Sequence, residues 1–153
     1  SRLFREVREK RGLVYEIGTQ VKRYQDTGAF VVYAGCDPAK LETTVGTIVR
    51  ELTRIRRDVV PARELHRAKE FYGGQLLMTL EDTLEHMLWM GEQVVTLGHV
   101  GGADELRSRV ERVTPQQVRR AARHLFTGAR MFLAAVGPMP EHQASTLRGL
   151  CAL

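Results

Sequence analysis

The sequence has few cysteines and no long hydrophobic run. Its two cysteines, Cys36 and Cys151, lie far apart without CxxC spacing, so the sequence predicts neither a disulfide framework nor a cysteine metal site. This pattern favours a reducing compartment, and we expect a cytoplasmic location. A membrane-spanning helix needs a run of about 18 or more apolar residues. The chain has no such run, and we therefore expect no membrane partner.

Lysine is also scarce, because the chain has 19 arginines but only 4 lysines. The net charge is +5, yet 18 acidic residues are interleaved with the 23 basic ones. Such mixing is typical of a solvated surface with many ion pairs. No zinc-finger, RNP or basic-region spacing accompanies the arginines, so we expect no nucleic-acid partner. An arginine-rich nucleic-acid-binding domain remains a weaker alternative.

The length and the hydrophobic content favour one compact domain. A chain of 153 residues that is 43% hydrophobic can bury a single core and is too short for two comfortable domains. The sequence begins at Ser1 inside a helical pattern and without a methionine. We therefore expect it to be a piece of a longer protein.

The opening stretch, SRLFREVREKRGLVYEIGTQV, joins a predicted helix to a predicted strand. Leu3, Phe4 and Val7 form an apolar stripe, while arginines recur at every third position on another face. Gly12 follows a cationic last turn, as expected of a left-handed helix cap. Beyond Gly12 the apolar pattern alternates with a period of two, which predicts a strand.

Turn residues and caps place the remaining elements. Asp26-Thr27-Gly28 precedes a second β-rich run, Ala29 to Gly35, which predicts an antiparallel hairpin. Helix starts are predicted at Asp37-Pro38, at Pro61 and at Thr114. A further helical segment is predicted to end at the break at residues 98–102. At Thr114 the pattern is a capping box with Gln117.

A third apolar run, Ala129 to Val136, predicts a late strand. The order of elements therefore predicts an α+β fold, with a mostly antiparallel sheet and helices packed on one face. Three strands are few for so many helices. We expect at least one more strand before Ser1, and an exposed sheet edge that a second copy could cover.

One helical stretch comes close to a known zinc motif. Asp82-Thr83-Leu84-Glu85-His86 is one residue short of HxxEH, which places two zinc-binding histidines and a general-base glutamate on one helix turn. Here Asp82 takes the place of the first histidine, and a third ligand would still be needed. Physical reasoning alone therefore predicts an α+β domain with no metal site and no catalytic residue of its own.

The first fifteen residues, SRLFREVREKRGLVY, closely resemble the hallmark of the C-terminal half of pitrilysin/insulysin-family zinc peptidases, particularly the mitochondrial-processing-peptidase-like branch. The resemblance continues in order over nearly the whole chain. It includes Tyr24, Asp26-Thr27-Gly28, Phe30, Tyr33-Ala34-Gly35, Pro38, Glu64-Leu65, Ala68-Lys69, Leu80-Glu81, Val113-Thr114, Val118, Ala121 and Val136-Gly137-Pro138.

The resemblance implies a truncated processing-peptidase-like α/β sandwich domain. Residues 1–138 would be a C-terminal substrate-holding domain that lacks its first strand and helix, and residues 139–153 a C-terminal tail. It also implies a clamshell-shaped peptidase whose zinc is bound by HxxEH and a distal glutamate in an N-terminal half, which is absent here. We expect no cofactor in this piece, which alone would be inactive.

Arg8 and Tyr15 are the substrate-binding residues that the resemblance implies. A guanidinium and a phenol both donate hydrogen bonds, and fixed donors can stabilise the negative charge that develops on a peptide carbonyl under attack. The expected partners are a peptide substrate and the zinc-binding domain or subunit, in a homodimer or heterodimer. Without the resemblance, Arg8 would instead be taken to neutralise the helix end and Tyr15 to pack in the hairpin.

A second function, that of a non-enzyme, stays open. The same fold can serve as a non-catalytic scaffold or assembly subunit of the core-protein type. An intact HxxEH in the missing half would favour the enzyme.

Overall fold

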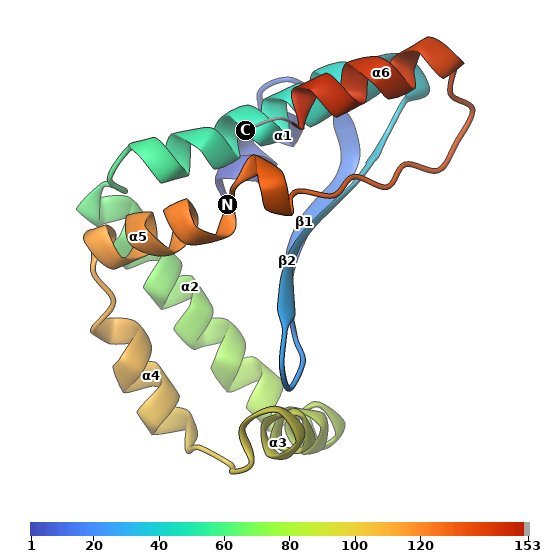
Figure 1. Cartoon of the computed structure of the whole chain (residues 1–153). Coiled ribbons are helices and arrows are strands. Elements are labelled where there is room, and N and C mark those ends of the chain that lie inside the picture. The colour runs from blue at the N-terminus through green and yellow to red at the C-terminus, as the bar shows by residue number, and fades with distance from the viewer. Residues whose placement is uncertain (152–153) are drawn as a thin grey trace. The chain divides into compact units, whose positions relative to one another are not determined.

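The computed structural model describes residues 1–151 and shows a hairpin followed by a series of helices (Figure 1). The elements in chain order are η1 (Phe4–Glu9), β1 (Val14–Arg23), β2 (Gly28–Cys36), η2 (Pro38–Lys40), α1 (Leu41–Arg57), α2 (Ala62–Glu81), α3 (Thr83–Leu97), α4 (Ala103–Glu111), α5 (Pro115–Leu125), η3 (Gly128–Arg130) and α6 (Glu141–Leu150). The fold is α+β, as predicted. None of the described helices is long and apolar enough to span a membrane.

Polar side chains cap the first turns of η2 and α5. The Asp37 carboxylate accepts a hydrogen bond of 2.8 Å from the backbone N–H of Ala39, as the Asp-Pro pair predicts. The capping box at the start of α5 is also confirmed. The Thr114 N–H donates to Oε1 of Gln117 over 2.8 Å, and the Gln117 N–H donates to Oγ1 of Thr114 over 3.2 Å.

The hairpin is confirmed, and among the described residues it is the whole sheet. Strands β1 and β2 pair in an antiparallel two-stranded sheet. The tight turn between them is closed by the Tyr24 N–H, which donates to the carbonyl of Thr27 over 2.9 Å.

The predicted third strand is wrong. Residues 128–130 form the short turn η3, and residues 131–136 continue without regular structure and pair with no strand in the described part of the protein. A strand needs a neighbour for its backbone N–H and C=O groups, and an apolar composition cannot supply one. The helix α4 was not predicted, because Leu106 and Val110 are too few to make a clear apolar stripe.

The predicted tail at residues 139–153 contains the helix α6, and residues 152–153 lie outside the described range. The chain divides into two compact units. The first unit comprises residues 1–20 and 30–59 and the chain from Val118 onward. The second comprises residues 21–29 and 60–117.

The core of the first unit forms around the opening stretch. Leu3, Val7, Leu13 and Val14 are buried together, and Ile48 of α1 packs against them. In this unit α6 lies along α1 (Figure 1). In the second unit α2 contacts both α3 and α4. The opening stretch is thus anchored by its apolar face, which leaves its polar face for other roles.

Candidate functional site

A tight turn at Gly12 connects η1 to β1. Gly12 has a φ of 54°, a left-handed conformation that favours glycine, so the predicted cap is confirmed. The Gly12 N–H donates to the carbonyl of Arg8 over 3.0 Å, and the Leu13 N–H donates to the carbonyl of Val7 over 3.1 Å. The Lys40 ammonium then donates to the carbonyl of Gly12 over 3.0 Å. Hydrogen bonds to η1 and from Lys40 therefore hold this turn in place.

Arg8 lies on the exposed face of η1. Its guanidinium carbon is 5.1 Å from the centroid of the Phe4 ring, a cation–π distance. The segment is π-helical, and the Lys10 N–H donates to the carbonyl of Arg5 over 2.9 Å. Such turns are frequent at functional sites. Within the described residues the Arg8 guanidinium makes no hydrogen bond or ion pair, so its donors are available to a ligand.

Tyr15 lies at the start of β1 and is 70% exposed. Its ring covers Gly35 of β2 so closely that a Cβ atom there would clash with the ring. Tyr33 covers Gly18 in the same way from the other strand. These two tyrosine–glycine contacts were not predicted. The facing glycines and tyrosines of the hairpin are the signal that could have revealed them.

Arg8 comes before the Gly12 turn and packs on the ring of Phe4. Tyr15 comes after the turn and covers Gly35. No hydrogen bond joins them to each other in the described part of the chain. Two donors that are not bonded to each other can both turn toward one ligand.

The other cations of the opening stretch are used within the chain. The buried carboxylate of Glu6 accepts from Lys10 over 2.8 Å, from Arg11 over 3.3 Å and from Arg5 over 3.4 Å. The hydrogen bond from Lys10, helped by the charge of Lys10 and by the hydrogen bonds from Arg11 and Arg5, lowers the pKa of Glu6 to about 2. Of the cations from Arg5 to Arg11, therefore, Arg8 alone is not held by Glu6.

Glu6 makes the stability of the chain pH-dependent. Its pKa is about 2 in the folded chain and 4.5 ordinarily, so its contribution is complete above about pH 4.5 and is lost as the pH falls toward 2. We expect the urea midpoint of the native chain to fall across this window. Glu6→Gln should flatten this part of the profile and lower the midpoint at pH 7. An unchanged slope in Glu6→Gln would contradict this assignment.

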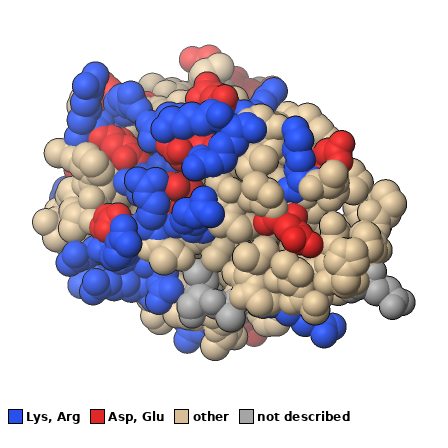
Figure 2. Space-filling view, turned by 90° about the horizontal axis from the view of Figure 1, so that it is seen from above, with Lys and Arg blue, Asp and Glu red and all other residues tan. Residues whose placement is uncertain are grey.

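Two arginines near the end of α1 are also paired with carboxylates. Arg54 donates to Glu51 over 2.8 Å, and Arg57 donates to Asp58 over 2.8 Å. The pKa of Arg54 is raised, chiefly by its hydrogen bond to Glu51. Figure 2 shows basic side chains gathered on one face with acidic ones among them. These pairs leave less free positive charge for a nucleic acid.

The zinc-like stretch does not fit a metal ion. In the part of the chain that the structure describes, no three His, Cys, Asp or Glu side chains lie close enough to hold one. Asp82 instead caps α3, accepting from the Glu85 N–H over 2.9 Å. His86 packs near Trp89, with ring centroids 6.0 Å apart.

Comparison with known proteins identifies the family. The family described as "Peptidase M16 inactive domain" matches residues 1–72, which include Arg8, the Gly12 turn and Tyr15. An uncharacterized zinc protease of Streptomyces coelicolor is 36% identical over 152 residues, which cover 99% of this chain and 33% of that protein. Residues 1–72 belong to the M16 peptidase family, and the similarity to proteins named zinc proteases extends over nearly the whole chain.

Other M16 relatives give the same picture. An uncharacterized zinc protease of Bacillus subtilis is 33% identical over 143 residues, which cover 92% of this chain and 35% of that protein. The chain thus spans about a third of the length of the curated relatives it matches. Among solved structures, a chain of complex III2 from Candida albicans with Inz-5 bound has a TM-score of 0.73 at 20% identity. The match covers 83% of this M16 chain and 30% of that one, and it shows the fold.

Proposed function

We propose that this chain is the substrate-holding C-terminal domain of a zinc-dependent endopeptidase that degrades or processes peptides in a clamshell chamber. One observation carries the proposal. Arg8 and Tyr15 are exposed donors on either side of the fixed Gly12 turn and make no hydrogen bond within the described chain, whereas their cationic neighbours are bonded to Glu6.

The two residues supply donors of different strength. A charged guanidinium forms strong hydrogen bonds with carbonyl oxygens or carboxylates of a peptide. A phenolic hydroxyl is a neutral donor, and it can stabilise charge that builds up on a carbonyl oxygen during cleavage. Arg8 would hold the peptide in both its bound and reacting forms, and Tyr15 would act mainly as charge develops.

The rest of the enzyme would lie outside these residues. Zinc would be a cofactor of the complete enzyme, held by an N-terminal domain in the same polypeptide or by a partner subunit, and this piece alone would cleave nothing. We propose a homodimer or heterodimer in the cytoplasm. The match to longer relatives named zinc proteases supports this arrangement.

A second candidate is a non-catalytic scaffold of the same fold. The fold that the chain shares with a subunit of complex III2 favours it. The discriminating observation is the remaining sequence, because an intact HxxEH supports the peptidase and its loss supports the scaffold.

The experiment that tests the proposal is Arg8→Gln in the complete protein. A hydrogen bond to a charged group contributes about 1.5–3 kcal/mol, so we expect peptide binding to weaken at least about tenfold. The readout is the dissociation constant of a fluorescent peptide. Arg5→Gln is the matched control, since it removes the same charge from the same helix at a longer, 3.4 Å contact. Equal peptide affinity in both variants and the native protein would refute the role of Arg8.

A further inference from the structure

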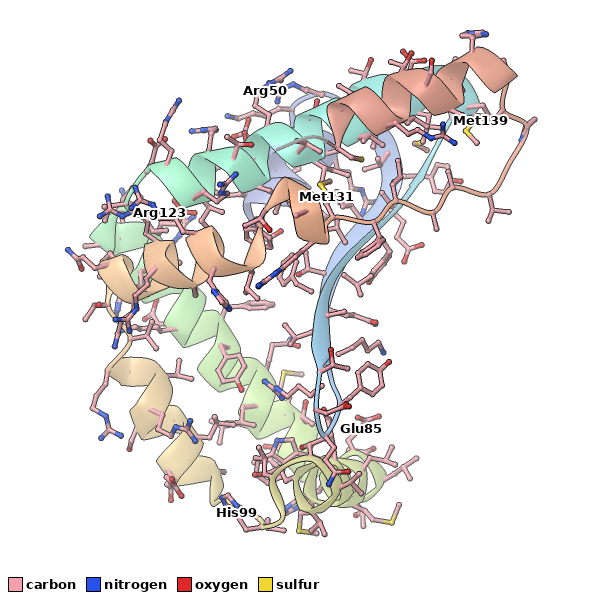
Figure 3. The ribbon with its side chains drawn as sticks, viewed as in Figure 1. Arg50, Glu85, His99, Arg123, Met131 and Met139 are labelled. Atoms are coloured by element: carbon pink, nitrogen blue, oxygen red, sulfur yellow. The ribbon has the colours of Figure 1, made fainter. Side chains whose placement is uncertain are left out.

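The C-terminal part of the first unit contains an open pocket of about 520 Å³. One wall is the helix α6, and the other is the segment 131–139 that follows η3. Figure 3 labels Met131 and Met139 at the two ends of that segment. Small-molecule sites in proteins commonly have volumes of about 300–1,000 Å³. The pocket therefore has the size of a ligand site.

One face of α6 forms the first wall. The residues of the helix and its C-cap that line the pocket are Ala144, Leu147, Arg148 and Cys151. Residues spaced by three and four positions share one face of a helix. Leu147 is buried, while Ala144 and Arg148 are exposed. This wall is therefore uncharged except for one guanidinium.

The opposite wall is apolar and loosely packed. It is lined by Met131, Phe132, Leu133, Ala135 and Met139. The side chain of Phe132 is 92% exposed, so most of its ring has no contact within the described chain. Covering such a ring with an apolar group is favourable. Methionine side chains are flexible and adapt to apolar ligands of varied shape, so this wall suits an apolar chain.

Arg148 is the only charged residue among the described residues that line the pocket. Its guanidinium makes no hydrogen bond or ion pair within the described part of the chain. By contrast, Arg54 donates to Glu51 over 2.8 Å, and Arg123 donates to a backbone carbonyl over 3.1 Å. The helix dipole favours a cation in the last turn of α6, but it does not require an apolar pocket beside that cation.

We propose that the pocket binds a monomeric amphiphile with one anionic head and one apolar chain, such as a medium-chain fatty acid. The head would pair with Arg148, and the chain would lie between α6 and residues 131–139. A guanidinium can bind a carboxylate or a phosphate through two parallel hydrogen bonds. Neither Arg8 nor Tyr15 lines the pocket, so the proposal does not depend on the peptidase function.

Charge complementarity favours this occupant over others. A nucleic acid or the surface of an anionic bilayer is held by several free cations, and the described lining of the pocket has one. A wholly apolar ligand would leave the guanidinium without an acceptor. A ligand with one anionic head and an apolar chain matches both the cation and the apolar walls.

Replacing Arg148 by methionine tests the contact with the head. Arg148→Met keeps a long side chain and removes the charge, so we expect the complete protein to bind decanoate at least about tenfold more weakly. The readout is the dissociation constant from isothermal titration calorimetry, at concentrations where decanoate is monomeric. Decanol has the same chain without the charge, and its affinity should be the same in the native and variant proteins.

Arg50→Met is the matched control. Arg50 is an exposed arginine of α1 in the same unit, and it lies outside the pocket (Figure 3). Its guanidinium also makes no hydrogen bond or ion pair within the described residues. We expect Arg50→Met to leave the affinity for decanoate within about twofold of the native value. Equal affinity in the two variants would overturn the proposal.

The two native thiols show where the ligand lies. Cys151 lines this pocket, whereas Cys36 lines another cleft, beside β2, and both are half-buried. With decanoate at about ten times its dissociation constant, iodoacetamide should label Cys151 about tenfold more slowly, by mass action. Labelling of Cys36, read from the same peptide mass map, should not change. Protection of Cys36, or of neither thiol, would place the ligand elsewhere and overturn the proposal.

Two further probes distinguish the sources of an anionic head. Decyl phosphate replaces the carboxylate of decanoate with a phosphate on the same chain. Binding of either compound that Arg148→Met weakens about tenfold supports the proposal, and the tighter of the two identifies the head. Binding to phosphatidylglycerol vesicles without binding of either monomer would assign the pocket to a bilayer and overturn the proposal.

Discussion

Replacing Tyr15 by phenylalanine in the complete peptidase is expected to lower kcat/KM on the order of 10²-fold, the usual cost of one lost donor to a developing oxyanion. The change removes a single hydroxyl and keeps the ring over Gly35. Because Tyr15 is 70% exposed and makes no hydrogen bond within the described chain, the free energy of unfolding should change by less than about 0.5 kcal/mol. Cleavage of a fluorogenic peptide and urea unfolding measure the two effects.

Tyr33→Phe is the matched control for this prediction. Tyr33 lies on the partner strand and covers Gly18 as Tyr15 covers Gly35, but it lies outside the opening motif. We expect Tyr33→Phe to leave kcat/KM within about twofold of the native value, because the hydroxyl that it removes is not a transition-state donor. If Tyr15→Phe retains full cleavage and full peptide binding, the assigned role is wrong.

Replacing Leu147 by alanine should produce the largest loss of stability. Leu147 is 4% exposed on α6, the helix that lies along α1. Gly46 of α1 faces α6, and a Cβ there would lie in ordinary van der Waals contact, 3.6 Å from the side chain of Leu150. Removing a buried leucine side chain costs about 2–5 kcal/mol in the free energy of unfolding. Urea titration of the native and variant chains measures it.

The same substitution at an exposed leucine provides the comparison. Leu125 at the end of α5 is 50% exposed, and Leu125→Ala should cost less than about 1 kcal/mol. If both variants lost the same free energy of unfolding, the packing of α6 along α1 would make no specific contribution to stability.

Local chemistry made much of the fold predictable. Gly12, Asp37 and Thr114 each act through hydrogen bonds within a few residues, and all three predictions are confirmed. The strand predicted at residues 129–136 depends on a distant neighbour, which a local pattern cannot show. That is why the one prediction about long-range pairing is wrong while the hairpin, whose strands are adjacent in sequence, is right.

Of the candidate site, the sequence could predict only which two residues take part, and not what they contact. The family resemblance selected Arg8 and Tyr15, and they remain a proposal. The contacts of these side chains depend on packing that a sequence does not specify, namely the Phe4 ring under Arg8 and the missing Cβ of Gly35 under Tyr15. The network around Glu6 was not predicted either, although it determines which cation stays available.

The left-handed turn at Gly12 makes the number of residues between Arg8 and Tyr15 a structural constraint. Directly after the turn, Val14 is buried and Tyr15 is exposed. Inserting or deleting one residue there would exchange the two faces of β1, turning the tyrosine inward and a core side chain outward. A two-residue insertion would restore the face but displace the hydroxyl by about 6.6 Å, at 3.3 Å per residue. Length variation in this family should therefore be tolerated in the hairpin loop and not between these two residues.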